Sequence, residues 1–193
     1  MGVHFASQDE GGETGEDTYR GQLKVALMLA PGEAKKGKTK ATLKIVIKQA
    51  RDLPNMEAKG VTDGFVKCYL LPDRSTSGKR KTKVVKNSIN PVWEEQFTYD
   101  KLTLEELSRE RVLEVTIWDY HKHGSDFIGG LRLGPTPGRA AKQNDWMDSI
   151  GEEISHWEAT LAHPGEWVEQ WHTLRTTMDP RSVGSYFAAD DII

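Results

Sequence analysis

The feature that most constrains the fold is a strongly basic segment placed between two apolar ones. Residues 65–71 and 92–99 are rich in apolar and aromatic side chains and have the length of strands. Turn residues at 72–73, 77–78 and 90–91 mark off a third strand between them. This third strand carries Lys79, Arg80, Lys81 and Lys83. A strand this basic cannot be buried on both faces, so one face must meet water or an anionic partner.

The remaining strands follow the same scheme of short segments separated by turns. Apolar and polar residues alternate along 42–48 and again along 112–119, as in strands that bury one face. Further strands are expected at 21–30, 127–133 and 167–174, and residues 31–40 are interpreted as a polar loop. Eight short strands of this kind predict an all-β fold, an eight-stranded antiparallel β-sandwich.

Two helical segments interrupt the strands. Residues 102–109 have Thr103 as a cap and Glu106 three positions later, the spacing of a capping box. Residues 149–152 repeat this spacing as Ser-Ile-Gly-Glu, before a helical pattern that ends at Pro164. The apolar residues of this second pattern are Trp146, Ile150, Ile154, Trp157 and Leu161. One inserted α-helix is therefore expected just before the last strand.

The net charge of -3 conceals a strong asymmetry. Residues 35–86 contain 15 Lys and Arg against four Asp and Glu, a net +11, so the remainder carries -14. Such a segment predicts a directional basic surface for an anionic partner, and membrane phosphates and nucleic acid both fit on charge alone.

Cys68 is the only cysteine, which excludes an internal disulfide and fits a reducing, cytoplasmic compartment. Its place in a strand favours a small buried residue over a reactive thiol. No apolar run approaches the ~20 residues that span a bilayer, and no signal-peptide pattern opens the chain.

Four segments, taken in this order, resemble a C2 domain: TDGFVKCYLLPD, KRKTKVVKNSINPVWEEQFTY, LEVTIWDYHKHGSDFIGGLRLG and QWHTL. With the insert DWMDSIGEEISHW, the chain is similar to the second, C-terminal C2 domain of the synaptotagmin-like proteins, a family of Rab effectors. The resemblance covers residues 19–177 and implies a Greek-key C2 β-sandwich. Residues 1–18 are expected to be a disordered leader or an added segment, and 178–193 a flexible C-terminal tail.

The resemblance places a calcium-binding rim on two loops. Its ligand positions fall on Glu57, Asp63, Asp119, His121 and Asp126. His121 offers an imidazole where calcium prefers oxygen, and Glu57 is longer than the usual aspartate. The loop from Asp119 to Asp126 is also shorter than the family pattern by one position. Calcium is therefore not required, and we expect its binding to be weak or absent.

The resemblance also places a phosphoinositide site on the basic strands. Lys67, Lys81 and Lys83 match the headgroup-binding lysines, and Trp118 matches an aromatic residue that packs on the headgroup. Phe65 replaces a tyrosine that is common in this pattern. Lys79, Arg80 and Lys86 are expected to add long-range attraction. A two-residue period puts Lys79, Lys81 and Lys83 on one face and turns Arg80 to the other.

The segment Trp171-His172-x-Leu174 resembles a motif on the last strand of synaptotagmin second C2 domains that is linked to protein partners. The alternative is structural: Trp171 and Leu174 pack in the core or under the helix, and His172 is exposed. The same packing role is expected for Trp146 and Trp157.

No G-x-S-x-G, phosphate-binding glycine loop or H-E-x-x-H pattern is present, so the chain is not expected to be an enzyme. Aromatic residues do not alternate with the basic ones as nucleic-acid stacking requires. We therefore predict a cytoplasmic module, peripheral on the plasma membrane or a secretory vesicle, that binds anionic phospholipid such as phosphatidylinositol 4,5-bisphosphate. The resemblance implies vesicle docking and exocytosis, with Rab binding by the parent protein but not by this segment. The alternatives are a protein-binding scaffold for exocytic partners without a lipid role, and weak calcium-dependent phospholipid binding.

Overall fold

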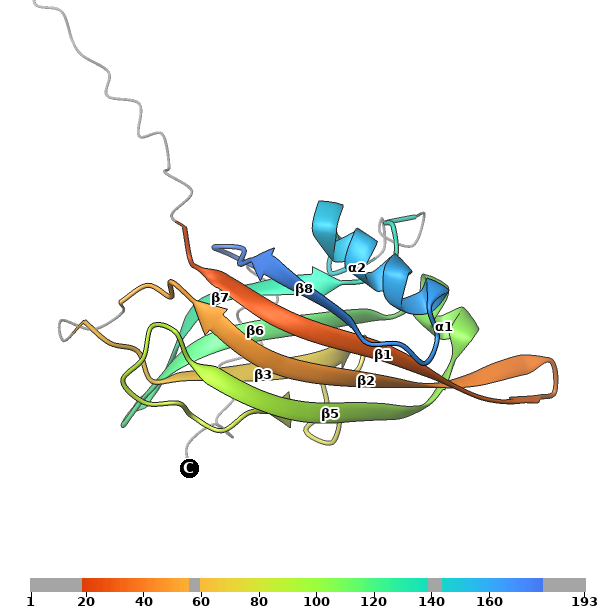
Figure 1. Ribbon diagram of the computed structural model, residues 1–193, viewed down its shortest axis with the longest axis horizontal. Coiled ribbons are helices and arrows are strands. Elements are labelled where there is room, and N and C mark those ends of the chain that lie inside the picture. The colour runs from red at the N-terminus through yellow and green to blue at the C-terminus, as the bar shows by residue number, and fades with distance from the viewer. Residues whose placement is uncertain (1–18, 56–59, 139–143, 179–193) are drawn as a thin grey trace, which may run out of the picture.

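The structure, a computed structural model, describes residues 19–55, 60–138 and 144–178. Two four-stranded antiparallel sheets face each other, one ordered β5-β2-β1-β8 and the other β4-β3-β6-β7 (Figure 1). The strands are β1 Gln22–Lys35, β2 Lys38–Arg51, β3 Gly64–Leu71, β4 Arg80–Lys81, β5 Val92–Thr103, β6 Val112–His121, β7 Gly124–Leu133 and β8 Val168–Thr173. The eight-stranded antiparallel sandwich predicted from the sequence is confirmed.

Alternating side chains fill the space between the sheets. Leu43, Ile45 and Ile47 of β2 are fully buried, as are Val115 and Ile117 of β6. Cys68 lies in the same core as a free thiol, and burial raises its pKa well above the ordinary value. The sequence prediction of a small, unreactive core cysteine agrees with this environment.

Both helices begin at or next to the predicted positions. In α1 (Leu104–Arg109) the Thr103 hydroxyl accepts the Glu106 N–H, and the Glu106 carboxylate accepts the Thr103 N–H, which confirms the capping box. In α2 (Gly151–Ala162) the cap position is Ile150, not Ser149, and Glu153 accepts the Ile150 N–H. The capping box of α2 therefore lies one residue after the predicted one.

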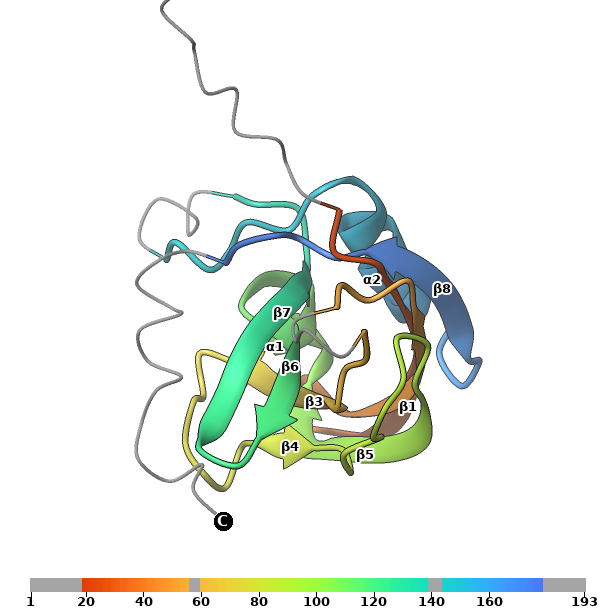
Figure 2. The ribbon, with the colours of Figure 1, turned by 90° about the vertical axis from the view of Figure 1, so that its left-hand side faces the viewer.

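The face that α2 buries is mixed. Trp157 is 1% exposed and donates to the Leu107 carbonyl, but Ile150 is 62% exposed. The other buried residues of the helix are polar: Glu153, His156 and Thr160. Helix α2 lies beside β8 at an open side of the sandwich (Figure 2).

The prediction of a polar loop at 31–40 is wrong. Strands β1 and β2 continue through these residues as a hairpin. Ala34 pairs with Thr39 and Lys35 with Lys38, so only Lys36 and Gly37 form the turn. Their φ angles, 53° and 75°, are both positive, as a type I′ turn requires. Polar composition hid this strand pairing, since neither face of the extension is buried.

The outer face of the second sheet is covered near β6 and β7. Glu114 and Arg132 are both fully buried, and Arg132 Nε lies 2.8 Å from Glu114 Oε2. Asp148 accepts hydrogen bonds from Arg132 at 3.0 Å and from Arg175 at 2.9 Å. Arg175 also pairs with Gly130 through two backbone hydrogen bonds, which fastens the segment after β8 to the second sheet.

Within the described residues, no helix has the length and apolar character needed to cross a bilayer.

Candidate functional site

The outer face of the second sheet carries two lysines over aromatic rings. Phe65 of β3 and Trp118 of β6 are cross-strand partners, and both are buried. Lys67 Nζ lies 4.5 Å from the Trp118 ring centroid, and Lys81 Nζ lies 4.4 Å from that of Phe65. We call Phe65, Lys67, Lys81 and Trp118 the lysine–aromatic cluster. The negative faces of the rings attract the ammonium groups, so this platform fixes both cations on the sheet.

The two lysines of the cluster differ in access. Lys67 is only 2% exposed, whereas Lys81, its partner across the strands, is exposed. The sequence prediction of Lys67 as a direct headgroup ligand conflicts with this burial. The Lys67 side chain lies against the rings of Phe65 and Trp118, in a strand whose residues are all buried except Tyr69. Lys81 is therefore the member of the cluster that a ligand reaches first.

Arg80 points away from the cluster, as the two-residue period predicts. Its guanidinium carbon lies 4.6 Å from the Tyr99 ring centroid, and it donates to the carbonyls of Ser77 and Thr98. These contacts tie β4 to β5 across the sandwich edge. Arg80 therefore contributes positive charge at a distance but is not aligned with Lys81.

The same period fails after Lys81, because the named strand β4 contains only Arg80 and Lys81. Thr82 is buried, and its hydroxyl accepts the Val66 N–H, where a regular strand would use a backbone carbonyl. Val84, three positions after Lys81, packs on the same Phe65–Trp118 pair. Lys83 is exposed, but the alternation that would align it with Lys81 is interrupted.

Three exposed lysines at this edge have no ion-pair partner in the described part of the chain: no carboxylate lies within 4.0 Å of Lys81, Lys83 or Lys86. We call these three residues the edge lysines. Among their backbone groups, the Lys83 N–H donates to Glu95 Oε1 at 2.7 Å. Lys79 is half-buried at the start of the same segment and adds charge nearby. The ammonium groups of the edge lysines are available to an anion.

The loops at one end of the sandwich bring together part of the predicted calcium rim. Asp63, Asp119 and His121 line one hollow of about 340 Å³, and Lys122 lines it too. Asp126 lies within reach of His121, with Oδ2 3.5 Å from the imidazole Nε2. Glu57 lies outside the described residues.

Two of the described rim carboxylates already accept backbone hydrogen bonds. Asp63 Oδ1 accepts the Asn87 N–H at 2.8 Å, and Asp119 Oδ1 accepts the Asp63 N–H at 2.8 Å. These carboxylates hold the loop backbone. Among the described residues no three His, Cys, Asp or Glu side chains are grouped to hold a metal ion. Calcium needs six to eight oxygen ligands, and here a lysine and an imidazole occupy the same rim.

In the last strand, the directions of Trp171 and His172 are the opposite of those expected if the motif were purely structural. His172 is 2% exposed and Leu174 is 3% exposed, so these two face the interior. Trp171 is half-buried on the opposite face of β8, where the Arg51 guanidinium lies 4.2 Å from its ring centroid. Only the core position of Leu174 matches that alternative. Alternation along a strand explains the result, because residues 172 and 174 share a face.

A buried pair of histidines is a feature that the sequence analysis missed. His156 of α2 and His172 of β8 stack with ring centroids 5.0 Å apart, and His156 Nδ1 lies 2.8 Å from His172 Nε2. His156 Nε2 lies 2.8 Å from the Val168 carbonyl, so Nε2 carries the proton and Nδ1 accepts from His172. Burial lowers the pKa of both rings, and that of His172 falls to about 4. Both rings are therefore neutral at pH 7.

Two cations on the outer face of the first sheet share one carboxylate. Glu169 of β8 forms ion pairs with Lys24 of β1 and with Lys48 of β2, the latter at 2.8 Å. The hydrogen bond from Lys24, followed by that from Lys48, lowers the pKa of the Glu169 carboxyl. Lys24 and Lys48 are therefore compensated by Glu169.

The C2 domain family model matches residues 41–149 of the chain. The fold agrees: the crystal structure of a C2 domain of RIM from Drosophila superposes with a TM-score of 0.57 at 26% identity, over 81% of this chain and 99% of that one. The corresponding C2 domain of RIM2 gives a TM-score of 0.52 at 28% identity, over 81% and 99%. The chain belongs to the C2 domain family, whose members are non-enzymatic modules that bind membranes or proteins.

Within that family, the chain is similar to synaptotagmin-like proteins. It is 37% identical over 163 residues to mouse synaptotagmin-like protein 2 and 32% identical over 166 residues to mouse synaptotagmin-like protein 1. These alignments cover 83% and 84% of this chain but only 17% and 29% of the two relatives. The chain thus spans a small part of the length of these relatives.

Proposed function

We propose that this C2 domain binds anionic phospholipid, with phosphatidylinositol 4,5-bisphosphate as the preferred headgroup, through Lys81 and its neighbours. The observation that carries the proposal is the ammonium group of Lys81, exposed and held over the Phe65 ring without an ion-pair partner among the described residues. Lys83 and Lys86 add further charge on the following residues. Phe65 and Trp118 form the aromatic platform, over which the Lys67 ammonium group also lies.

The electrostatics explain why a specific contact is needed. A basic residue near an anionic leaflet contributes roughly 1 kcal/mol, so the edge lysines together give roughly 3 kcal/mol, a dissociation constant of about 6 mM. That affinity does not hold an isolated domain on a membrane. A specific bisphosphate contact at Lys81, or avidity from a neighbouring domain, supplies the remainder.

We propose that calcium is dispensable for this binding. Among the described residues Asp63 and Asp119 line the hollow together with His121 and Lys122, so a calcium ion would find few oxygen ligands there and would meet a cation. The similarity to synaptotagmin-like proteins supports a peripheral role on plasma or vesicle membranes in docking and exocytosis. Rab binding belongs in this proposal to the parent protein and not to this segment.

Vesicle co-sedimentation at near-physiological salt tests the proposal. The wild-type chain and the Lys81→Glu/Lys83→Glu variant are compared on phosphatidylserine vesicles with and without the bisphosphate lipid, in calcium and in chelator. We expect equal binding of the wild type in calcium and in chelator, and loss of the lipid-specific part in the variant. Binding of the wild type only in calcium would contradict the calcium-independent mechanism.

One observation favours a protein partner as a second function. Trp171 is half-buried on the outer face of β8, with Arg51 stacked on it, and tryptophan and arginine are enriched among interface hot spots. A protein-binding role predicts that Trp171→Ala abolishes partner binding while Lys81→Glu/Lys83→Glu leaves it intact.

A further inference from the structure

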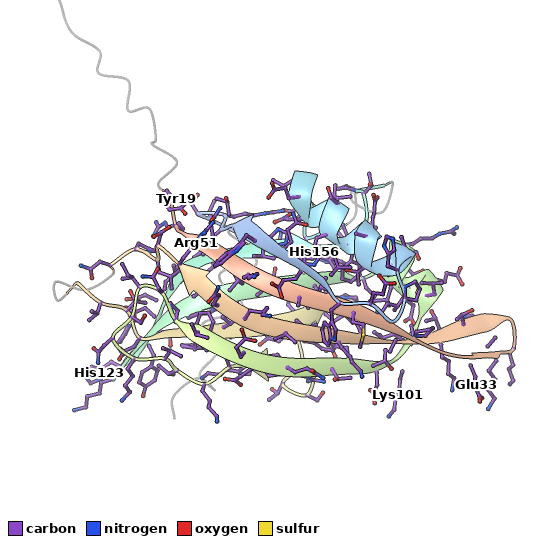
Figure 3. All side chains as sticks on the ribbon, viewed as in Figure 1. Tyr19, Glu33, Arg51, Lys101, His123 and His156 are labelled. Atoms are coloured by element: carbon purple, nitrogen blue, oxygen red, sulfur yellow. The ribbon has the colours of Figure 1, made fainter. Side chains whose placement is uncertain are left out.

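The β1–β2 hairpin extends past the rest of the first sheet. The last pair between β2 and β5 is Lys40 with Thr103, and the last pair between β1 and β8 is Leu27 with Val168. Residues 31–40 are all exposed. Glu33 marks this end of the molecule and His123 the opposite end (Figure 3). The hairpin tip is therefore a separate surface, remote from the rim loops.

The tip is basic and lacks compensating acids. It carries Lys35, Lys36, Lys38 and Lys40 against Glu33, four cations and one anion for a net +3. Over the described residues, no carboxylate lies within 4.0 Å of any of these four lysines. Lys24 and Lys48 lie on the same two strands, yet both pair with Glu169. The tip lysines differ from this pair because no carboxylate of the described residues compensates them.

The backbone keeps these charges together. The type I′ turn at Lys36 and Gly37 closes the hairpin in two residues, and its twist matches that of the flanking strands. Lys35 and Lys38 are directly paired across the strands, an arrangement of like charges that is unfavourable unless an anion or salt neutralises it. The hairpin thus places at least two lysines opposite each other at its tip.

The chemistry of the tip fits an extended anionic surface better than a shaped partner. All four cations are lysines, which act as hydrated point charges, and none is an arginine with its planar fork. The tip also has no aromatic residue to stack on a base or to fill a pocket on a protein. A lipid leaflet presents many mobile phosphates, so binding to it does not require the lysines to be held in a fixed arrangement.

We propose that the tip of the β1–β2 hairpin is a second contact with anionic phospholipid membranes, independent of the lysine–aromatic cluster. It recognises surface charge and not a particular headgroup. Each lysine near an anionic leaflet raises the partition coefficient by about fivefold. The tip supplies the affinity that the edge lysines lack.

The test uses the full 193-residue chain and phosphatidylcholine vesicles containing phosphatidylserine but no phosphoinositide. Replacing Lys35, Lys36, Lys38 and Lys40 by Gln should lower binding by up to about fivefold per residue. Replacing the same four by Arg keeps the charge and should keep the binding. All variants should retain the wild-type melting temperature, because the tip contributes nothing to the core.

The two sites are separated by repeating these substitutions in the Lys81→Glu/Lys83→Glu background. We expect the Gln substitutions to remove the residual phosphatidylserine binding there too, whereas the Arg substitutions leave it. Binding of the four-Gln variant equal to wild type overturns the proposal for the hairpin. So does unchanged vesicle binding accompanied by lost binding to nucleic acid or an acidic protein. Failure of the proposed headgroup site appears differently, as no effect of Lys81→Glu/Lys83→Glu alone.

Discussion

Two groups of lysines, one on each sheet of the sandwich, differ in their ion pairing. On the first sheet, Lys24 and Lys48 share the carboxylate of Glu169, which lies 121 residues beyond Lys48 in the chain. At the edge of the second sheet, Lys81 and Lys83 are exposed and have no carboxylate partner among the described residues. The sequence shows the same alternating lysines in both places. The contrast shows that pairing across the fold, and not lysine content, separates a structural cation from an available one.

The strongest test of the comparison is to break a fully buried pair. Arg132→Ala removes the fully buried one of the two cations that pair with Glu114, which we expect to cost about 3–5 kcal/mol in the free energy of unfolding. Urea denaturation measures this loss. Membrane binding measured well below the unfolding midpoint should not change. A stability loss below about 1 kcal/mol would show that Arg74, 2.8 Å from Glu114, compensates for the missing partner.

Protonation of the histidine pair should be the next largest effect. Because the pKa of His172 is about 4 in the folded chain and 6.5 for the ordinary side chain, the unfolded chain binds the extra proton first as pH falls. Stability is therefore fully present above about pH 6.5 and declines by about 1.4 kcal/mol per pH unit towards about pH 4. Urea denaturation at a series of pH values checks this. His172→Gln should have a shallower slope, and an equal slope would place the proton uptake elsewhere.

Within the lysine–aromatic cluster, the buried and the exposed lysine should separate stability from binding. Lys81→Met should lower vesicle binding about fivefold and leave stability unchanged. Lys67→Met should change vesicle binding by less, because that side chain is 2% exposed. Co-sedimentation and thermal melts on both variants make the comparison. Equal loss of binding in the two variants would mean that Lys67 becomes accessible on the membrane.

The smallest effect is expected where a paired lysine is released. Glu169→Gln frees Lys24 and Lys48 on the exposed face of the first sheet and should cost less than about 1 kcal/mol of stability. It should raise binding to phosphatidylserine vesicles by up to about fivefold, since one negative charge is removed. Glu152→Gln, an exposed residue in the first turn of α2, is the charge-matched control. Equal gains in both variants would show that only net charge matters.

Much of the fold follows from local sequence rules. The alternation of Leu43, Ile45 and Ile47 predicts a strand with one buried face, and the Thr103–Glu106 spacing predicts the start of α1. These succeed because the nearest neighbours in sequence decide the outcome. The hairpin at 31–40 was not predictable in this way, because its strands pair without burying a face.

The residue types of the candidate site could be predicted from the sequence, but the solvent exposure of each side chain could not. The charge asymmetry points to the segment that carries the edge lysines. Burial of Lys67 and the interruption at Thr82 depend on contacts between strands, which no local pattern contains. The inward direction of His172 is different, since its two-residue spacing from the apolar Leu174 already implies it. The histidine pair itself required α2 and β8 to meet.

The pairing of Gln22 with Thr173 has a mechanical consequence. Strands β1 and β8 are adjacent and antiparallel, so tension applied to both ends of the domain pulls the two strands apart at this pair. The backbone hydrogen bonds between them would then be loaded one after another, a geometry that yields at lower force than simultaneous shearing. Arg175, held by Asp148, Glu153 and Gly130 just after β8, lies in the path of that force. The contacts of Arg175 must therefore break before β1 and β8 begin to separate.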